Sequence, residues 1–325
     1  MRSALASLIA TGALLAALSF AVRAEDAPYP ARPIRLIVPT TPGSPPDLVA
    51  RLIGEKLTAR LGQPVVYENR PGASGIVGLE AVARSKPDGH TLGAIAMPYV
   101  VNATLVPHMP YDMEKDLAPV ALIDWSYNIL VVPSGSAVKS IPDLIAAAKT
   151  KPGSLKFSSG GNGTPGHLAG ELLKRETGID IAHIPYKGAA APVVALLAGD
   201  VDMTFGAVGV LSPHLKGGKV HALATPAPHR IAAFPEVPTF AELGYKGIEI
   251  RDWQGFVAPA GTPSAIIEHL SSEIAEAASM PDVKARLEVL GMEPAFAGPQ
   301  PFATHLHDEL NRWRALVRDA GIKPD

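Results

Sequence analysis

The sequence predicts an α/β protein made of two doubly wound α/β domains. Segments patterned as strands alternate with segments patterned as helices almost throughout the chain, which favours parallel sheets covered by helices on both faces. The chain has 325 residues, of which 47% are hydrophobic, and this is enough for two domains with separate cores. The pattern also restarts once, near the middle of the chain, without a low-complexity linker.

The first half opens with a strand at 34–38, which precedes a helix whose leucine and isoleucine residues recur at helical spacing as far as Leu61. Gly62 is expected to end that helix, since glycine accepts the left-handed conformation common at helix ends. One helix and two strands are then expected in this half, the helix at 76–83 and the strands at 65–67 and 91–96.

The pattern restarts with an apolar strand at 129–132. The elements expected after it are helices at 141–149, 166–176 and 190–198, and strands at 155–158, 181–184, 201–205 and 220–224. Three helices are expected to finish the chain, at 263–278, 282–289 and 300–319. The last helix carries a stripe of apolar residues typical of a buried helix face, formed by Leu306, Leu310, Trp313 and Leu316.

Two crossing segments are expected to join the α/β units, one near 123–125 and one near 252–254. The first domain is then discontinuous in sequence. We therefore expect a first domain of residues 25–124 plus 252–325, and a second domain of residues 125–251.

Residues 1–24 have the pattern of a cleavable signal peptide. Arg2 precedes an apolar run, and small residues at Val22 and Ala24 make cleavage before Glu25 plausible. An uncleaved membrane anchor is the alternative, because the run is almost long enough to span a bilayer. The chain has no cysteine, so it is neither a lipoprotein nor a disulfide-stabilised domain. The sequence therefore predicts an exported protein located in the periplasm.

Charge and histidine content exclude several partners. The formal net charge is −2 and becomes more negative without Arg2 and Arg23, so the basic footprint of a nucleic-acid-binding protein is missing from the sequence. The ten histidines form no cluster with the spacing of metal ligands. We therefore expect neither nucleic acid nor a metal or cofactor as a partner.

The loop at 39–47 joins the end of the first strand to the start of a helix. Ser44 is placed to cap that helix, and Asp47 would complete a capping-box-like Ser-x-x-Asp. Thr40 and Thr41 add hydroxyl groups at the carboxyl end of a parallel strand, where open α/β sheets bind ligands. The loop is expected either to bind a ligand through these side chains or to do no more than cap the helix.

A second strand-to-helix loop, at 158–167, is rich in glycine. Its glycines have the spacing G-x-G-x-x-G, which lets the backbone and a helix start approach an anion closely. A similar turn at 69–75 is expected equally to be a ligand contact or a structural turn. Within 158–167, the residues expected to bind the ligand are Ser159, Gly160, Asn162, Thr164 and His167.

Two enzymatic interpretations of the glycine-rich loop are weak. A dinucleotide fold would place an acidic residue after the next strand, but Pro-Tyr-Lys-Gly follows 181–184. A secreted serine hydrolase is the alternative, because Ser159, His167 and Asp202 supply the residue types of a catalytic triad. The chain lacks a G-x-S-x-G elbow, and serines beside a helix start are better explained as hydrogen-bond donors. We therefore expect a protein that is not an enzyme.

Several motifs, in a fixed order, cover almost the whole mature chain. They are YPARPIRLIVP at 29–39, ENRPGA at 68–73, PDG at 87–89, GTPGHLAGE at 163–171, HIPYKG at 183–188, PEVPT at 235–239 and APAGTP at 258–263. In this combination the chain resembles the extracytoplasmic solute receptors of tripartite tricarboxylate transporters, the Bug or TctC family.

That resemblance implies a type II periplasmic binding protein, in which two α/β domains close on a ligand cleft by a hinge motion. It implies a small organic acid as ligand, no cofactor, and transporter membrane subunits as partners of a monomeric receptor. A sensor protein in place of the transporter is the alternative within the same fold. The carboxylate would be held by loops 40–47 and 158–167. Tyr99, for which ordinary packing is the alternative, and Asp202 complete the candidate ligand-binding residues.

The first loop departs from the family pattern. The family usually has Ala-Pro-Gly-Gly-x-x-Asp, whereas residues 41–47 read Thr-Pro-Gly-Ser-Pro-Pro-Asp. Because proline has no backbone N–H, Pro45 and Pro46 are expected to remove amide donors and to narrow the site.

Overall fold

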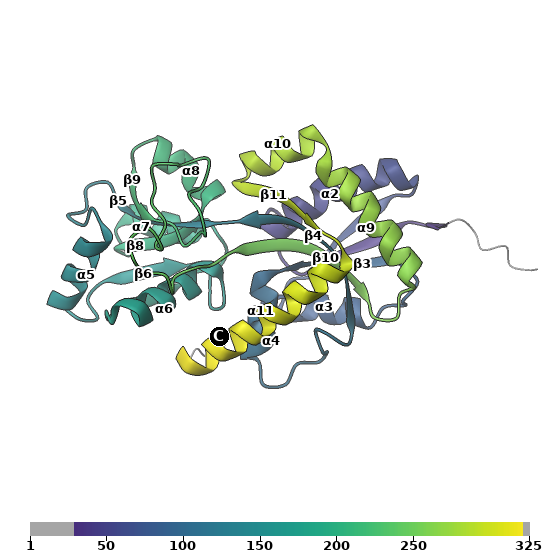
Figure 1. The fold of residues 1–325 in the computed structure, drawn as a ribbon, viewed down its shortest axis with the longest axis horizontal. Helices are drawn as coiled ribbons and strands as arrows, with labels where there is room; N and C mark the ends of the chain where they lie inside the picture. The colour runs from purple at the N-terminus through teal and green to yellow at the C-terminus, as the bar shows by residue number, and fades with distance from the viewer. Residues whose placement is uncertain (1–28, 321–325) are drawn as a thin grey trace, which may run out of the picture.

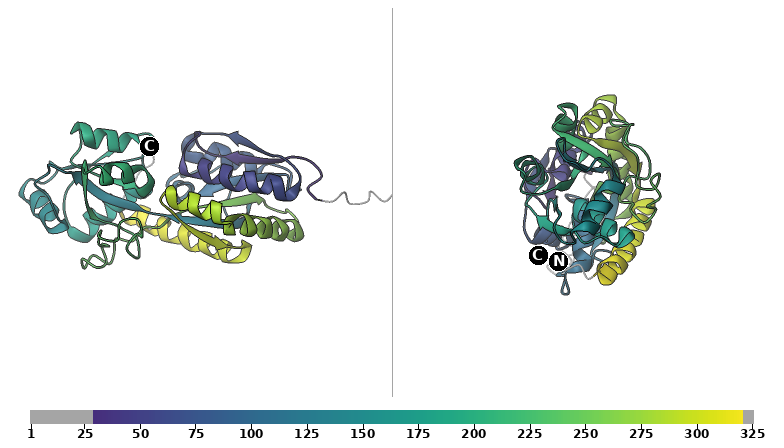
Figure 2. Two further views of the ribbon diagram at one scale, coloured as in Figure 1. Left: turned by 90° about the horizontal axis from the view of Figure 1, so that it is seen from above. Right: turned by 90° about the vertical axis from the view of Figure 1, so that its left-hand side faces the viewer.

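The computed structural model describes residues 29–320 as two lobes lying end to end along the long axis of the molecule (Figures 1 and 2). Each lobe is a β-sheet with helices packed on it, so the α/β class is confirmed. The predicted signal peptide lies outside the described residues. Within residues 29–320, no helix combines the length and the apolar character needed to cross a bilayer.

The sheet of the first lobe has six strands in the order β11-β4-β10-β3-β1-β2. They are β1 (Ile34–Val38), β2 (Val65–Asn69), β3 (Thr91–Ala96), β4 (Leu117–Ser126), β10 (Asp252–Pro259) and β11 (Met292–Ala297). The strands β1, β2 and β3 are parallel, whereas β10 is antiparallel to β3 and β4, and β11 is antiparallel to β4. The expected parallel pairing therefore holds for β1, β2 and β3, whereas β10, which returns from the other lobe, and β11 are antiparallel to their neighbours.

The helices of this lobe cover both faces of the sheet. They are α2 (Pro45–Leu61), α3 (Ile76–Ala83), α4 (Met97–Leu105), α9 (Ser264–Ser279), α10 (Pro281–Val289) and α11 (Pro299–Ala320). As predicted, Gly62 ends α2 in the left-handed conformation, with a φ of 67°. The predicted apolar stripe of α11 is also confirmed as core, since Trp313 is fully buried and Leu306, Leu310 and Leu316 are buried.

The sheet of the second lobe has five strands in the order β7-β6-β8-β5-β9. They are β5 (Asn128–Pro133), β6 (Lys156–Ser159), β7 (Ala182–Pro185), β8 (Met203–Ala207) and β9 (Val220–Ala224), and the helices are α5 (Ile141–Thr150), α6 (Pro165–Thr177), α7 (Ala191–Ala198) and α8 (Val208–Lys216). Here β6 is parallel to β7 and β8, and β5 is antiparallel to β8 and β9.

The chain passes between the lobes twice, in segments that lie side by side (Figure 1). Tyr127 alone separates β4 from β5, and the return begins where β10 starts at Asp252. Because β4 and β10 are hydrogen-bonded neighbours, Asp252 is directly opposite Ser126. The side chains that end β4 and begin β10 therefore lie at the junction of the two lobes.

The lobes also touch at a pair of glycines, Gly209 in α8 and Gly291 before β11. A Cβ atom on Gly291 would lie 2.6 Å from the backbone nitrogen of Gly209, and one on Gly209 would collide with the carbonyl oxygen of Leu290. The backbone of α8 is therefore in contact with the backbone at 290–291, and only glycine allows so close an approach.

Candidate functional site

Three loops that each connect a strand to a helix meet around α4. The Tyr99 hydroxyl shares a hydrogen bond with Thr40 in the loop after β1. Asn102, one turn further along α4, donates from Nδ2 to the carbonyl oxygen of Ser74 in the loop after β2, at 3.3 Å. Its Oδ1 lies 2.7 Å from the position that a Cβ of Gly163 would occupy in the loop after β6. The helix thus contacts two loops of its own lobe and one of the other.

Asp47 fixes the loop after β1 from within. Its Oδ2 accepts hydrogen bonds from Gly43 N at 2.9 Å and Arg51 Nε at 3.0 Å, and its Oδ1 accepts one from Asn69 Nδ2 at 2.9 Å. Asn69 Nδ2 also donates to the Thr40 carbonyl oxygen at 3.0 Å. Burial would raise the pKa of Asp47, but these hydrogen bonds outweigh it and hold the pKa below its usual value. Asp47 is therefore ionised and buried, and its hydrogen bonds stabilise the conformation of this loop.

The predicted capping box at the start of α2 is wrong in its contacts. Ser44 stands at the N-cap position, but its side chain makes no capping hydrogen bond, and Asp47 binds Gly43 N instead of the Ser44 backbone. Pro46 at the second helical position offers no N–H, so one of the two donors from which an N-cap side chain can accept is missing. The Ser44 Oγ is buried and has no hydrogen-bond partner within residues 29–320, while Thr41 is exposed.

The loop after β6 is also braced internally. The Ser159 Oγ accepts from Gly161 N at 3.2 Å, and the Thr164 Oγ1 donates to the Gly161 carbonyl oxygen at 2.7 Å. The Gly160 carbonyl oxygen accepts from Gly188 N at 3.3 Å. Gly161 and Gly163 have φ values of 128° and 72°, so glycine is required at both. These hydroxyl groups shape the loop that the sequence identified.

His167 is buried against the same loop. Its Nδ1 accepts from Gly163 N at 3.1 Å, and its ring stacks on His183 with the centroids 4.1 Å apart. Burial, followed by the neighbouring His183, lowers the pKa of His167 to about 3. The imidazole is therefore neutral at neutral pH, and it serves as an acceptor for the loop backbone.

The triad considered for a hydrolase does not form. The Ser159 Oγ lies 2.7 Å from Nε2 of His183, whereas His167 binds the loop backbone. Asp202 precedes β8, and its Oδ2 accepts from Lys156 N at 2.7 Å, at the opposite end of β6 from the loop. Asp202 therefore lies at the other end of β6 from the remaining predicted residues of the second lobe.

A polar cluster that the sequence analysis did not single out lies where β4 and β10 cross between the lobes. We call it the junction cluster, and it consists of Asp124, Ser126, Asp252 and Gln254. Gln254 is paired across the strands with Asp124, and Asp252 with Ser126, so all four side chains lie on one face of the sheet. Only the position of Asp124 in an otherwise apolar strand could have identified the cluster beforehand.

Hydrogen bonds connect part of the junction cluster. The Ser126 hydroxyl donates to Asp252 Oδ2 at 3.2 Å and accepts from Gln254 Nε2 at 3.5 Å. Within the described residues, both carboxylate oxygens of Asp124 and the Oε1 of Gln254 are buried without a hydrogen-bond partner. Burial and the nearby charge of Asp252 raise the pKa of Asp124 well above its usual value. Burial, and to a lesser extent Glu309, raises the pKa of Asp252 to about 7.

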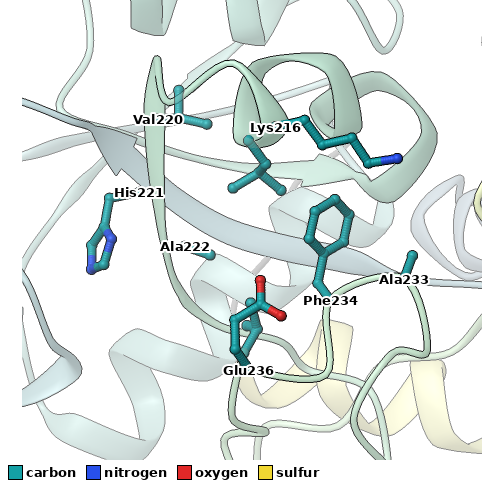
Figure 3. Close-up of a pocket in the computed structure, with 9 residues that line it drawn as sticks. Lys216, Val220, His221, Ala222, Ala233, Phe234 and Glu236 are labelled. Carbon is teal, nitrogen blue, oxygen red and sulfur yellow. The ribbon is translucent and has the colours of Figure 1, made fainter.

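Two cavities lie elsewhere. One of about 480 Å³ lies between α8, β9 and the segment 233–237 of the second lobe, with Phe234, Lys216 and Glu236 among its lining residues (Figure 3). Another of about 460 Å³ is lined by residues of both lobes, including Tyr127 and Glu293, whose side chains share a hydrogen bond of 3.0 Å. Neither is lined by a residue of the three loops. Within residues 29–320, no group of His, Asp and Glu side chains could hold a metal ion.

Comparison with known proteins gives a consistent result. Residues 49–322 match the family model described as the tripartite tricarboxylate transporter family receptor. BugT of Bordetella pertussis is 37% identical over 318 residues, covering 97% of this chain and 98% of BugT. A protein of R. palustris solved with adipate is 34% identical, with a TM-score of 0.83 and coverage of 91% and 100%. MatC of Rhodopseudomonas palustris, with bound malate, is 31% identical, with a TM-score of 0.77 and coverage of 89% and 100%.

Proposed function

Because the chain belongs to the tripartite tricarboxylate transporter receptor family, we propose that it captures a small organic carboxylate between its lobes and delivers it to the membrane subunits of such a transporter. The proposed location is the periplasm, as for the binding proteins it resembles. The proposed role is capture and release without chemical change, which agrees with the failure of Ser159, His167 and Asp202 to form a triad.

The observation that carries this proposal is the meeting of three strand-to-helix loops, from both lobes, around α4. Helix starts and turns of this kind direct N–H groups and hydroxyls at an anion, and the helix dipole favours a negative charge there. Thr40, Ser44 and Tyr99 would contribute from the first lobe, and Gly160, Asn162 and Thr164 from the second. The adipate and malate bound to two similar proteins are ligands of this class.

The Ser44 hydroxyl provides a direct test of the first loop. It makes no capping bond, so Ser44→Ala is expected to change the free energy of unfolding by less than about 0.5 kcal/mol. A hydroxyl that binds the ligand would nevertheless weaken carboxylate binding by about tenfold when removed, which is a typical hydrogen-bond contribution.

Ser140 supplies the matched control, since its Oγ does cap α5 by accepting from Asp143 N at 3.2 Å. Ser140→Ala is expected to cost about 1 kcal/mol of stability and to leave binding unchanged. Thermal-shift measurements with acetate, succinate, malate, adipate and citrate would give both quantities, since a ligand at about 100 times its Kd adds about 2.7 kcal/mol. Failure of every acid to stabilise the protein would refute the proposed function, and unchanged binding by Ser44→Ala would remove that hydroxyl from the site.

A further inference from the structure

The junction cluster contains more hydrogen-bond acceptors than donors. When both carboxyl groups are ionised, its acceptors include the four carboxylate oxygens of Asp124 and Asp252 and the Oε1 of Gln254. Its donors are the Ser126 hydroxyl and the Gln254 amide, and both are used within the cluster. Asp124 and Gln254 are 0% and 2% exposed, so their unpartnered oxygens are deeply buried. Unsatisfied buried acceptors are costly and call for a donor from elsewhere.

Nearby cations do not supply that donor. Within the described residues, neither Asp124 nor Asp252 takes part in an ion pair, and the charged neighbour that raises the pKa of Asp252 is another acid, Glu309 on α11. A metal ion is not indicated either, because no suitable ligand set exists among these residues. An organic cation with N–H donors fits the cluster better, since an ammonium group satisfies several acceptors at once.

The position of the cluster places it within reach of the proposed carboxylate site. The sheet register sets Gln254 opposite Ala96, and continuing the β1–β3 pairing by three residues brings Thr40 level with Ala96. Neighbouring strands are about 4.8 Å apart, so the backbones of Thr40 and Gln254 are separated by about 10 Å, which a short organic acid can span. Tyr99 lies between the first loop and the junction cluster, because its hydroxyl is hydrogen-bonded to Thr40 and the charge of Asp252 contributes to its raised pKa.

Access to the cluster is through Asp252. Asp252 is half-buried, whereas Asp124, Ser126 and Gln254 are buried. Its carboxylate is oriented by Ser126 Oγ at 3.2 Å and by the backbone N–H of Trp253 at 2.9 Å. This leaves Asp252 as the group able to meet a ligand, and Asp124 as a second carboxyl group beside it.

We propose that the ligand is an amino-substituted carboxylate, whose ammonium group is received by Asp252, with Asp124 and Gln254 reinforcing the preference. The inference rests on the proposed function, since the loops around α4 would hold the carboxylate end. A ligand with a second carboxylate at this position and no amino group is disfavoured, because its negative charge would lie beside the Asp252 carboxylate.

Matched ligand pairs that differ only in the amino group test this inference. We would titrate aspartate against succinate, glutamate against glutarate and 6-aminohexanoate against hexanoate by calorimetry at pH 7. The amino member of at least one pair is expected to bind about tenfold or more tighter, as a charge-assisted hydrogen bond contributes. Asp252→Asn is expected to remove that preference by weakening the amino members, while the plain acids bind the variant at least as tightly as they bind the wild type. Asp200→Asn, the same change at an exposed turn, is the control and is expected to retain the preference.

Proton linkage gives a second readout that needs no variant. The titratable neighbours of Asp252 are Asp124 on β4, Glu309 on α11 and Tyr99 on α4. Since Asp252 has a pKa of about 7, an ammonium group that binds it would drive off part of its proton. The heat of binding for the amino member is then expected to differ between phosphate and Tris buffers, in the direction of proton release.

The outcomes separate the two proposals. Plain acids that bind as tightly as their amino counterparts in every pair would overturn the inference and leave the carboxylate receptor intact. Equal heats in the two buffers for a tightly bound amino acid would also overturn it. If no acid of either kind binds, the proposed function fails and the inference fails with it.

Discussion

The contact between Gly163 and α4 leads to a prediction about communication between the lobes. Gly163 has a φ of 72°, and an added Cβ would lie 2.7 Å from Asn102 Oδ1 and 3.4 Å from side-chain carbons of Val101 and Leu105. An ordinary contact needs about 3.4 Å or more. Gly163→Ala must therefore move either the loop or the Asn102 side chain by about 0.7 Å, in addition to the strain of a left-handed alanine, which costs about 1–2 kcal/mol.

Gly178 provides a control in which the strain is separated from the contact. Its φ is 68°, it ends α6, and nothing lies within 4 Å of an added Cβ. Gly178→Ala and Gly163→Ala are both expected to lower the Tm by about 2–8 °C, because 1 kcal/mol shifts the Tm of a protein of this size by about 2–4 °C. Only Gly163→Ala is expected to weaken carboxylate binding, by about tenfold.

Hydrogen exchange provides an assay that is independent of the ligand. Asn102 also holds the Ser74 carbonyl oxygen, so displacing it is expected to increase amide exchange in both α4 and the segment 72–75. Gly178→Ala is expected to leave exchange in these segments unchanged. Equal exchange and equal binding in the two variants would refute the view that α4 transmits contact between the lobes.

Three further predictions concern the hydrogen bonds of the first loop, the hydrophobic core and the junction cluster. Asn69→Ala removes hydrogen bonds to Asp47 and Thr40 and is expected to lower the free energy of urea unfolding by about 1–3 kcal/mol and to weaken carboxylate binding; an unaltered unfolding curve would contradict this. Trp313→Ala empties a fully buried site and is expected to cost about 3–5 kcal/mol in the same assay, whereas Arg314→Ala at the next, exposed position is expected to cost under about 0.5 kcal/mol. The raised pKa of Asp252 means that the folded state binds more protons than the unfolded state between about pH 4 and pH 7, so stability falls as pH rises through this range. Asp252→Asn is expected to flatten that fall by roughly 4 kcal/mol, and a pH profile parallel to the wild type would count against it.

The sequence predicted the regular elements well where one local signal dominated. The helix at 76–83 and the strands at 91–96 and 220–224 match the structure in their bounds. It missed α4, because a segment with a proline near its start and several β-branched residues has weak helix propensity, and burial against α11 decides its conformation. It also missed β4, β10 and β11 as strands, since it predicted only crossing segments near 123–125 and 252–254, and the pairing of these strands depends on how the chain returns from the second lobe.

The sequence predicted which loops form the candidate site, but not which hydrogen bonds their side chains make. Glycine spacing located the loop after β6, since the left-handed backbone at Gly161 and Gly163 has a direct sequence signature. The contacts of Asp47 could not be predicted from spacing, because one of them is with Asn69 at the end of a neighbouring strand. Asp124 and Asp252 are far apart in sequence, and only the pairing of β4 with β10 brings them together.

The internal bracing of the loops affects the thermodynamics of binding. Asp47 fixes one loop, and Ser159, Thr164 and His167 fix the other, through hydrogen bonds that need no ligand. Segments that are already ordered lose little conformational entropy when a ligand arrives, so the entropic cost of capture falls mainly on the relative movement of the lobes. Ligands that fit differently are then expected to share similar association rates and to differ chiefly in residence time.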